Sequence, residues 1–517
     1  MEQQVYRMSR IKFSKIFFAL ACLLIFYGKV FAEAENSRLD ELLRGFVAND
    51  LELQKYVLTA ESKKLLLSSA KIDNGISVEL STGEMKIQSS SDKTKISVTP
   101  SATLSIPKAN GTELSASLPY TVENGEKTLK NGSISLETGI ITSQSKKAKI
   151  NILEAERAYT EAKRNVRDRA LSAEKEFYES LKKLYGYAIS ISALKTDLYD
   201  DSVDLKVLET QGYSKTSAKY RQAYLKVESD KRDIMEKQRL LERETAVFAQ
   251  KCGFTYGRSI EYTDDNSDRE KAAENAYLSS MEFLPDSIPQ VDEVNIFKFS
   301  PKTYSKIESA EWDKYIGQLK RDSDYDMTLT AGLGYIINND FLADDNTNAA
   351  SDSVEGKLTW KWTGISASAG VGLPTGSSIT GGSCDKTFNP YYSFSLSLSP
   401  NDWRLSKLEK QQDKIDEKLE SIAVKSAEDD YQTELLDKTS TFHDLKWSEN
   451  SYAEEFDMYT KLESDMAAWL KQGIVTESDY LDAKNNKEKA RLNVMINEIE
   501  QIIFNNEVKL LFHDDAE

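Results

Sequence analysis

The sequence contains very little histidine and cysteine. Its 517 residues include two histidines and three cysteines. His443 and His513 each lie in a helix-like stretch without a nearby cysteine, so the groups that a zinc site or a histidine-dependent nucleophile needs are not brought together. Cys252 ends a predicted long helix and Cys384 lies in a Gly-rich loop, which does not support a disulfide framework. We therefore expect that the protein is not an enzyme and that it binds no metal and no cofactor.

Positive charge is also scarce. The formal net charge is -17, which excludes a nucleic-acid-seeking surface. The Gly-rich stretch from Gly370 through Gly376 to Gly382 has no lysine at the phosphate-loop position and precedes no strong helix. We interpret this stretch as an exposed loop.

Long apolar runs are missing after the N-terminus, and the mean hydropathy of -0.52 excludes a polytopic helical membrane protein. The only such run, Ile16–Tyr27, follows basic residues and precedes Val30-Phe31-Ala32, a pattern typical of a signal peptide over residues 1–32. It is shorter than the ~20 apolar residues of a spanning helix. Cys22 is a weak match to a lipid-attachment site, because the apolar run continues beyond it.

Two types of pattern alternate along the rest of the chain. Residues 39–71 show a helical period, and residues 75–141 show a period of two, with apolar residues alternating with Ser, Thr and Glu. From Thr142 to about Leu208 the helical period returns, with the three-and-four spacing of a coiled coil. Such a helix would be about 100 Å long, which is too long for a compact domain.

The second half repeats this order. A helix is expected from Pro301, strands from Asp326, and a long helix from about Trp403, with a strict heptad pattern at Leu405, Leu408, Gln412, Ile415, Leu419 and Ile422. The sequence thus predicts an α+β fold with a duplicated unit: residues 33–253, a connector at 254–300 without sustained period, and residues 301–517.

Two short segments at matching places in the repeats resemble one family. From Gln472 the chain reads QGIVTESDYLDAKNNKEKARLNV, and from Gln211 it reads QGYSKTSAKYRQAYLKVESD. Both are similar to the turns between the long helices of TolC-type outer-membrane efflux proteins. The resemblance implies a trimeric outer-membrane β-barrel continued by a periplasmic α-helical tunnel. A trimer is also plausible on physical grounds, because a few strands cannot close a lipid-exposed sheet.

The number of strands departs from the family. Each half of the family's chain contributes two strands, whereas each half of this sequence has up to four alternating runs. The additional runs are either hairpins outside the membrane or part of a larger barrel.

The resemblance also implies sites. Asp479 and Asp482 lie where the family has carboxylates around the periplasmic entrance. In a trimer they would form two stacked anionic rings sensitive to cations and pH. The alternative is that acids simply favour the first turns of a helix. The turns Gln211-Gly212-Tyr213 and Gln472-Gly473-Ile474 would dock an adaptor, although glycine is also the least strained residue for reversing a helix.

Aromatic residues of the second-half strands suggest a membrane girdle, although aromatics are also common on buried sheet faces. The residues are Tyr335, Trp360, Trp362, Tyr391, Tyr392 and Phe394.

The sequence therefore predicts a homotrimeric exit duct for efflux or type I secretion. It would lie in outer-membrane lipid, extend into the periplasm, and be recruited by a periplasmic adaptor and an inner-membrane pump. Two alternatives are a diffusion porin with a helical periplasmic extension and a periplasmic coiled-coil scaffold.

Overall fold

The computed structural model describes residues 38–83, 85–90, 93–123, 125–129, 131–257, 266–291, 300–324, 327–339, 351–375 and 390–513. These residues form long helices and antiparallel strands, with the order helix, strands and long helix occurring twice, which confirms the predicted α+β fold. The predicted signal peptide, Cys22, Cys384, Gly376 and Gly382 lie outside the described residues. Gly370 was predicted to begin an exposed loop, but it lies within the strand Ile365–Pro374.

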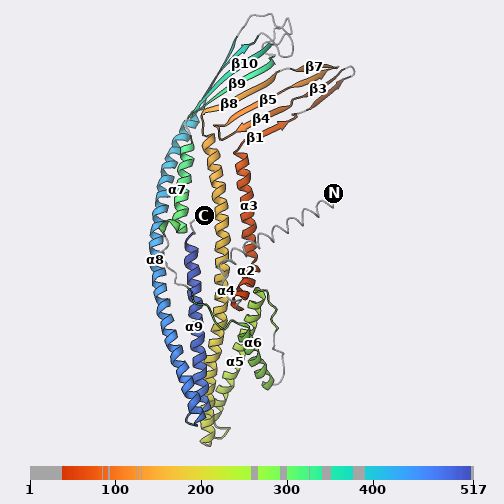
Figure 1. The fold of residues 1–517 in the computed structure, drawn as a ribbon. Helices are drawn as coiled ribbons and strands as arrows, with labels where there is room; N and C mark the ends of the chain where they lie inside the picture. The colour runs from red at the N-terminus through yellow and green to blue at the C-terminus, as the bar shows by residue number, and fades with distance from the viewer. Residues whose placement is uncertain are drawn as a thin grey trace. The chain divides into compact units, whose positions relative to one another are not determined.

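The helices of Figure 1 are, in chain order, α2 (Arg38–Ala48), α3 (Leu51–Asp73), α4 (Gln144–Thr210), α5 (Ala218–Lys251), α6 (Asn266–Phe283), α7 (Ser305–Ser323), α8 (Pro400–Lys471) and α9 (Glu477–Leu511). A short 3-10 helix, η2 (Pro301–Thr303), precedes α7. In the part of the chain that the structure describes, no helix has a stretch long and apolar enough to cross a membrane.

Two boundaries differ from the sequence prediction. The first helix is broken at Asn49 and Asp50 into α2 and α3. The Asp50 N–H donates to the Val47 carbonyl three residues back, at 3.3 Å, instead of continuing the helical pattern. The connector at 254–300 was predicted without regular structure, but it contains α6. That helix has no pronounced apolar stripe, which is why a periodicity argument does not detect it.

The chain divides into two compact units, and each unit draws on both halves of the sequence. The first comprises residues 1–51, 170–294 and 440–508. Its core is centred on Phe177, which is fully buried and lies 5.6 Å from Phe46, 5.3 Å from Phe248 and 5.2 Å from Tyr178, between ring centroids. Aromatic residues from α2, α4 and α5 thus hold this bundle together.

The second unit comprises residues 52–169, 295–439 and 509–517. Ion pairs give the lateral order of its helices. Lys71 of α3 pairs with Glu156 of α4 at 2.9 Å, Lys320 of α7 pairs with Glu154 of α4 at 2.7 Å, and Arg321 of α7 pairs with Glu420 of α8 at 2.7 Å. The order is therefore α3, α4, α7, α8, with α3 and α8 at the two sides.

The same unit contains an eight-stranded antiparallel sheet, the main sheet. Its strands are, in spatial order, β1 (Ser77–Ser81), β4 (Ser101–Ile106), β5 (Thr112–Ser117), β8 (Gly132–Ile141), β9 (Met327–Asn339), β10 (Ser351–Trp362), β11 (Ile365–Pro374) and β12 (Tyr391–Leu398). Each half of the sequence supplies four of these strands, as the alternating runs predicted.

A second sheet has four strands, and each of them is next in the chain to one of the first-half strands of the main sheet. Its order is β2 (Lys86–Ser90), β3 (Lys93–Val98), β6 (Tyr120–Glu123) and β7 (Glu126–Leu129). Within residues 75–141, where the sequence shows a continuous period of two, the strands are broken at Pro100 and, on the neighbouring strand, at Pro119. Proline has no N–H for the ladder, so the sheet is interrupted where the two prolines lie on adjacent strands, one residue out of register with each other.

Candidate functional sites: the sheet faces and the helix turns

The strand register places the apolar residues of the main sheet on one face. The pairing runs from Val78 through Leu104, Leu114, Leu136 and Leu333 to Tyr392 on β12. We call the surface built from this parity the apolar sheet face. Its residues are highly accessible: Leu80 is 77% exposed, Leu333 64% and Phe394 75%. A folded chain does not leave such a face in water without reason.

The opposite face carries hydroxyl groups and charges. The hydroxyls of Ser115 and Ser135 lie 2.7 Å apart across β5 and β8, and those of Ser368 and Ser395 lie 2.7 Å apart across β11 and β12. We call this surface the polar sheet face. The main sheet therefore has one apolar face and one polar face.

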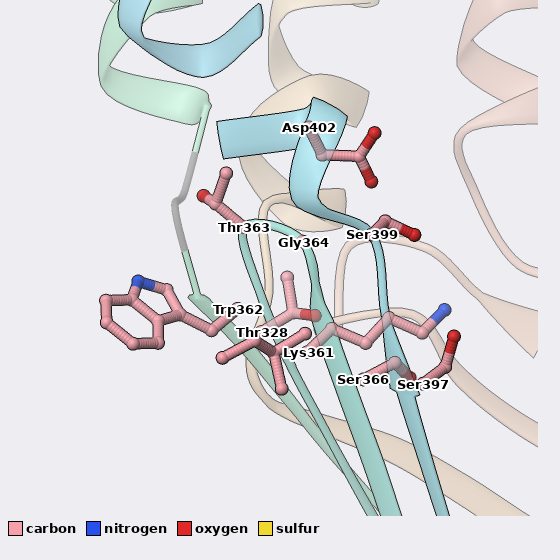
Figure 2. Close-up of a pocket in the computed structure, with 10 residues that line it drawn as sticks. Thr328, Lys361, Trp362, Thr363, Gly364, Ser366, Ser397, Ser399 and Asp402 are labelled. Atoms are coloured by element: carbon pink, nitrogen blue, oxygen red, sulfur yellow. The ribbon is translucent and has the colours of Figure 1, made fainter. Parts of the chain in front are cut away.

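The end of the main sheet next to α8 shows this separation directly. A pocket of about 320 Å³ opens there, lined on the polar side by Lys361, Ser366, Ser397 and Asp402. Figure 2 shows the Trp362 ring pointing to the opposite side from the Lys361 side chain, although the two residues are adjacent in β10.

The predicted aromatic residues lie at two levels on the main sheet. Trp360 and Trp362 are near the end of β10 that is closest to α8, with ring centroids 6.2 Å apart. Tyr335 lies opposite Val354, eight residues from Trp362 along β10, and its hydroxyl donates to Asp352 at 2.7 Å. Tyr392 lies opposite Val371, also away from the tryptophans, and Phe394 lies between the two levels.

Tyr391 does not belong to the same surface as the other five aromatic residues. It pairs with Gly372 and has the parity of Ser393, so it lies on the polar sheet face. Successive side chains of a strand point to opposite faces, which separates Tyr391 from Tyr392. A girdle on the apolar side therefore cannot include Tyr391.

Trp403 was not singled out from the sequence. It lies in the first turn of α8, is 49% exposed, and its indole N–H donates to the Thr363 carbonyl oxygen in the β10–β11 turn. It adds a third tryptophan near Trp360 and Trp362. The sequence signal that could have identified Trp403 is its position where the last predicted strand ends and the long helix begins.

The two predicted docking turns have the same geometry. Gly212 has φ 77° and Gly473 has φ 72°. The N–H of Tyr213 donates to the Leu208 carbonyl at 3.1 Å, and that of Ile474 donates to the Trp469 carbonyl at 3.0 Å. This is the Schellman arrangement, in which a left-handed residue after the helix lets later N–H groups reach its last carbonyls.

Both turns present exposed apolar side chains at the same end of the first unit, where α4 and α8 finish (Figure 1). Tyr213 is 38% exposed and Ile474 is 65% exposed. The positive φ of both glycines accounts for their place in the turns, and docking of a partner there stays a prediction.

Asp479 and Asp482 lie in the first turns of α9 in different settings. The exposed Asp479 carboxylate accepts from the backbone N–H of Thr476, and the Thr476 side chain accepts in return from the Asp479 N–H at 3.2 Å. This reciprocal pair is a capping box with aspartate in the third position. The half-buried Asp482 accepts from the Asn486 amide at 3.1 Å. The structure thus gives Asp479 a helix-capping role and leaves a role at the entrance as a prediction.

An ionic cluster in the second unit was also not predicted. Glu308 of α7 accepts hydrogen bonds from Arg157 and from Arg164 of α4, at 2.8 Å and 2.9 Å. Burial raises the pKa of the Glu308 carboxyl, but the two guanidinium groups outweigh it and hold the pKa at about 2. No short motif signals this cluster, because its members come from separate helices.

Neither histidine belongs to a cluster of metal ligands among the described residues. His443 is exposed on α8, and burial lowers the pKa of His513 beside the arginines of α4. Among the described residues, no group of three or more His, Cys, Asp or Glu could hold a metal ion.

Comparison with known families gives a match for each half of the chain. Residues 42–281 match the TP096X N-terminal domain, and residues 289–515 match the TP096X C-terminal domain. The chain belongs to the TP096X family. The two TP096X domains together extend over nearly the whole sequence after residue 41. No curated protein matches the chain.

Comparison of this TP096X protein with solved structures gives several similar chains. A membrane protein from Pseudomonas aeruginosa has 13% identity and a TM-score of 0.45, over 92% of this chain and 90% of that one. The outer membrane protein VceC from Vibrio cholerae has 12% identity and a TM-score of 0.42, over 91% and 94%. The CmeC outer membrane channel from Campylobacter jejuni has 10% identity and a TM-score of 0.43, over 93% and 87%.

Proposed function

We propose that the chain is a passive exit duct of the outer membrane, active as a homotrimer in efflux or type I secretion and without catalytic chemistry of its own. The observation that carries this proposal is the apolar sheet face. It runs over eight strands, it is exposed in the single chain, and the face behind it is polar. Strands with one apolar and one wet face suit a wall between lipid and an aqueous channel.

The dimensions of the apolar sheet face support a bilayer as its environment. The levels of Trp362 and Tyr335 are eight residues apart, which is about 26 Å along the strands. At a strand tilt of about 40° this corresponds to a height of about 20 Å, close to the ~25 Å apolar band of outer-membrane barrels. Aromatic residues at two levels suit the two interfaces of such a band.

Exposed apolar residues on the outer helices support an oligomer. Leu65 of α3 is 72% exposed and Leu408 and Ile422 of α8 are 60% and 61% exposed. The heptad positions of α8 thus have the spacing of a coiled coil, but they face solvent in the single chain. Neighbouring subunits would cover them.

The remaining roles belong to the same proposal and rest on the resemblance of the two turn segments. The turns at Gly212 and Gly473 would dock a periplasmic adaptor, and the motive force would come from an inner-membrane pump. Asp479 and Asp482 would surround the periplasmic entrance. Drugs, toxins or proteins are the expected classes of cargo.

The proposal is tested by tryptophan fluorescence of the chain lacking residues 1–32, reconstituted into vesicles with brominated phospholipids. Bromine quenches tryptophans that reach the acyl chains. We expect strong quenching that falls in Trp360→Phe and Trp362→Phe. The matched controls are Trp447→Phe and Trp469→Phe, which remove exposed helix tryptophans and should leave the quenched intensity unchanged, so that the quenched fraction rises.

Two outcomes would contradict the proposal. A monomer that stays in solution without detergent and shows no bromine quenching would favour a periplasmic coiled-coil scaffold. A large constitutive conductance in planar bilayers, unaffected by replacing Asp479 and Asp482, would favour a diffusion porin.

A further inference from the structure

We propose that all eight strands of the main sheet lie in the barrel wall and that β1 of one subunit pairs with β12 of the next, giving a closed barrel of 24 strands. This rests on the proposed function, which supplies the trimer. It concerns the edges of the sheet and the width of the duct.

The first argument is that the main sheet has two unpaired edges. In the described residues, β1 pairs only with β4, and β12 pairs only with β11. Unpaired N–H and C=O groups are not tolerated in hydrocarbon, so the edges of a lipid-facing sheet need partners.

The second argument is direction. Every neighbouring pair in the main sheet is antiparallel, and the sheet holds eight strands. An even number of strands makes β1 and β12 run in opposite directions. Identical subunits arranged in a ring therefore bring β12 next to β1 of the neighbour in antiparallel pairing, without any reversal of the chain.

The third argument is that the apolar sheet face includes both edge strands, because their apolar residues have the same parity as those of the strands between them. On β1 it ends with Val78 and Leu80, which are 66% and 77% exposed. On β12 it ends with Tyr392 and Phe394, which are 78% and 75% exposed. If four of the eight strands lay outside the membrane, this continuous face would be divided. The register thus favours one wall over a smaller barrel with separate hairpins.

The fourth argument comes from the helices attached to the edges. The chain enters β1 from α3 and leaves β12 into α8, and these are the two outer helices of the second unit. No residue of α3 is buried. Exposed apolar residues therefore continue from each edge strand onto its helix, on α3 at Leu65 and Ile72 and on α8 at Leu405 and Leu408.

These two surfaces differ from each other, as a ring requires. The surface of α3 and β1 on one subunit would meet the surface of α8 and β12 on the next, which is a heterologous contact that closes after a fixed number of copies. Eight strands from each of three subunits give 24 strands. At a spacing of about 4.8 Å and a tilt of about 40°, the backbone diameter of such a barrel is about 48 Å, twice that of a barrel with 12 strands.

Disulfide cross-linking between the two edges tests the pairing. The chain lacking residues 1–32 carries Cys384→Ser, and the buried Cys252 is kept. Glu79→Cys on β1 is combined in turn with Ser393→Cys, Ser395→Cys or Ser397→Cys on β12, all on the polar sheet face. Oxidation in detergent should give a ladder that ends at a covalent trimer, because opposed residues of paired strands lie close enough for a disulfide.

Antiparallel pairing also predicts how the best cross-linking partner shifts when the first cysteine is moved. Random collision between subunits would not produce this shift. Moving the β1 cysteine from Glu79 to Ser77 must move the best partner two residues forward on β12, and moving it to Ser81 must move that partner two residues back. The matched control places the first cysteine at Ser135 of β8, which is paired on both sides within its own subunit. It should give no cross-linked trimer.

The outcomes separate this inference from the proposed function. A detergent-requiring trimer with no β1–β12 cross-links, or with cross-links that do not shift in register, overturns the 24-stranded wall and leaves the duct in place. A soluble monomer overturns both. Electron cryomicroscopy of the unmodified protein gives an independent result, and a wall of 12 strands would contradict the inference even if the cysteine variants did not fold.

Discussion

The carboxylate of Asp479 accepts hydrogen bonds from both the backbone N–H and the hydroxyl of Thr476, at 2.9 Å and 2.7 Å. These bonds, first that of the hydroxyl and then that of the N–H, lower the pKa of Asp479. In a single subunit the carboxylate is therefore ionised at neutral pH, as an anionic ring at the entrance requires. Its capping role and its proposed role at the entrance are compatible.

We predict that the double variant Asp479→Asn and Asp482→Asn raises single-channel conductance in planar bilayers severalfold. The reason is that the variant removes the carboxylates that repel anions and bind cations at the entrance. The control is Thr476→Ala, which removes the capping hydroxyl and keeps both charges, so conductance should stay small. If Thr476→Ala opens the channel as much as the double variant does, helix capping and not charge controls the entrance.

We predict that a photo-crosslinking amino acid at Tyr213 or Ile474 captures a periplasmic adaptor in intact cells, since both side chains are exposed on the helix-reversing turns. The captured protein is identified by mass spectrometry. The control position is Leu278 of α6, which is 55% exposed in the same unit. Equal capture from Leu278, or no capture from either turn, would count against docking at the turns.

We predict that Glu308→Gln lowers the thermal midpoint followed by helical circular dichroism at pH 7 by about 4 to 8 °C, equivalent to about 2 kcal/mol. The variant leaves Arg157 and Arg164 close together without their shared carboxylate. Glu161→Gln is the control. Glu161 also pairs with Arg157, at 2.6 Å, but its side chain is 50% exposed, so its loss should change the midpoint little.

The same carboxylate predicts a pH dependence. Its pKa in the folded chain, about 2, lies below the ordinary value of 4.5. The contribution of Glu308 to stability is therefore fully present above about pH 4.5 and is lost as the pH falls towards 2. The midpoints of the wild type and Glu308→Gln should converge in acid. A constant difference between them from pH 7 to pH 2.5 would show that the ionised form is not responsible.

We predict the opposite pH dependence of stability for the contribution of Asp230 of α5. Burial first, and then the hydrogen bond with Asp201 and its charge, raise the pKa of Asp230 from 3.8 to about 6. Protonation favours the folded state, so this contribution is present below about pH 4 and is lost as the pH rises through 6. Asp230→Asn should raise the thermal midpoint at pH 7.5, by the equivalent of about 1 kcal/mol, and leave it unchanged at pH 4. The control is Asp233→Asn, on the exposed side of α5, which should show neither effect.

Local patterns in the sequence are sufficient for most of the secondary structure. The strict period of two from Met327 to Ile337 predicts β9, and the heptads from Leu405 to Ile422 predict the N-terminal part of α8. The two Gln-Gly turns are predicted because a helix reversal needs a residue with positive φ, and both glycines have it. The breaks at Pro100 and Pro119 were not predicted, because the apolar alternation continues across both prolines.

The arrangement of charged residues could not be predicted in the same way. Arg157 and Glu308 are 151 positions apart, and nothing in the local sequence indicates that they meet. Asp201 and Asp230 likewise meet only because α4 and α5 pack together. The placement of Tyr391 depends on the strand register, and a shift of one residue moves a side chain to the other face.

The sequence by itself determined the alternation of long helices with amphipathic strands, and the repetition of that order in the second half, because periodicity is a local property of the chain. Only the tertiary structure decided that four strands from each half join in one sheet, with β1 and β12 at its edges. Pairing between β8 and β9 joins residues far apart in the chain, and such contacts depend on the packing of the whole unit.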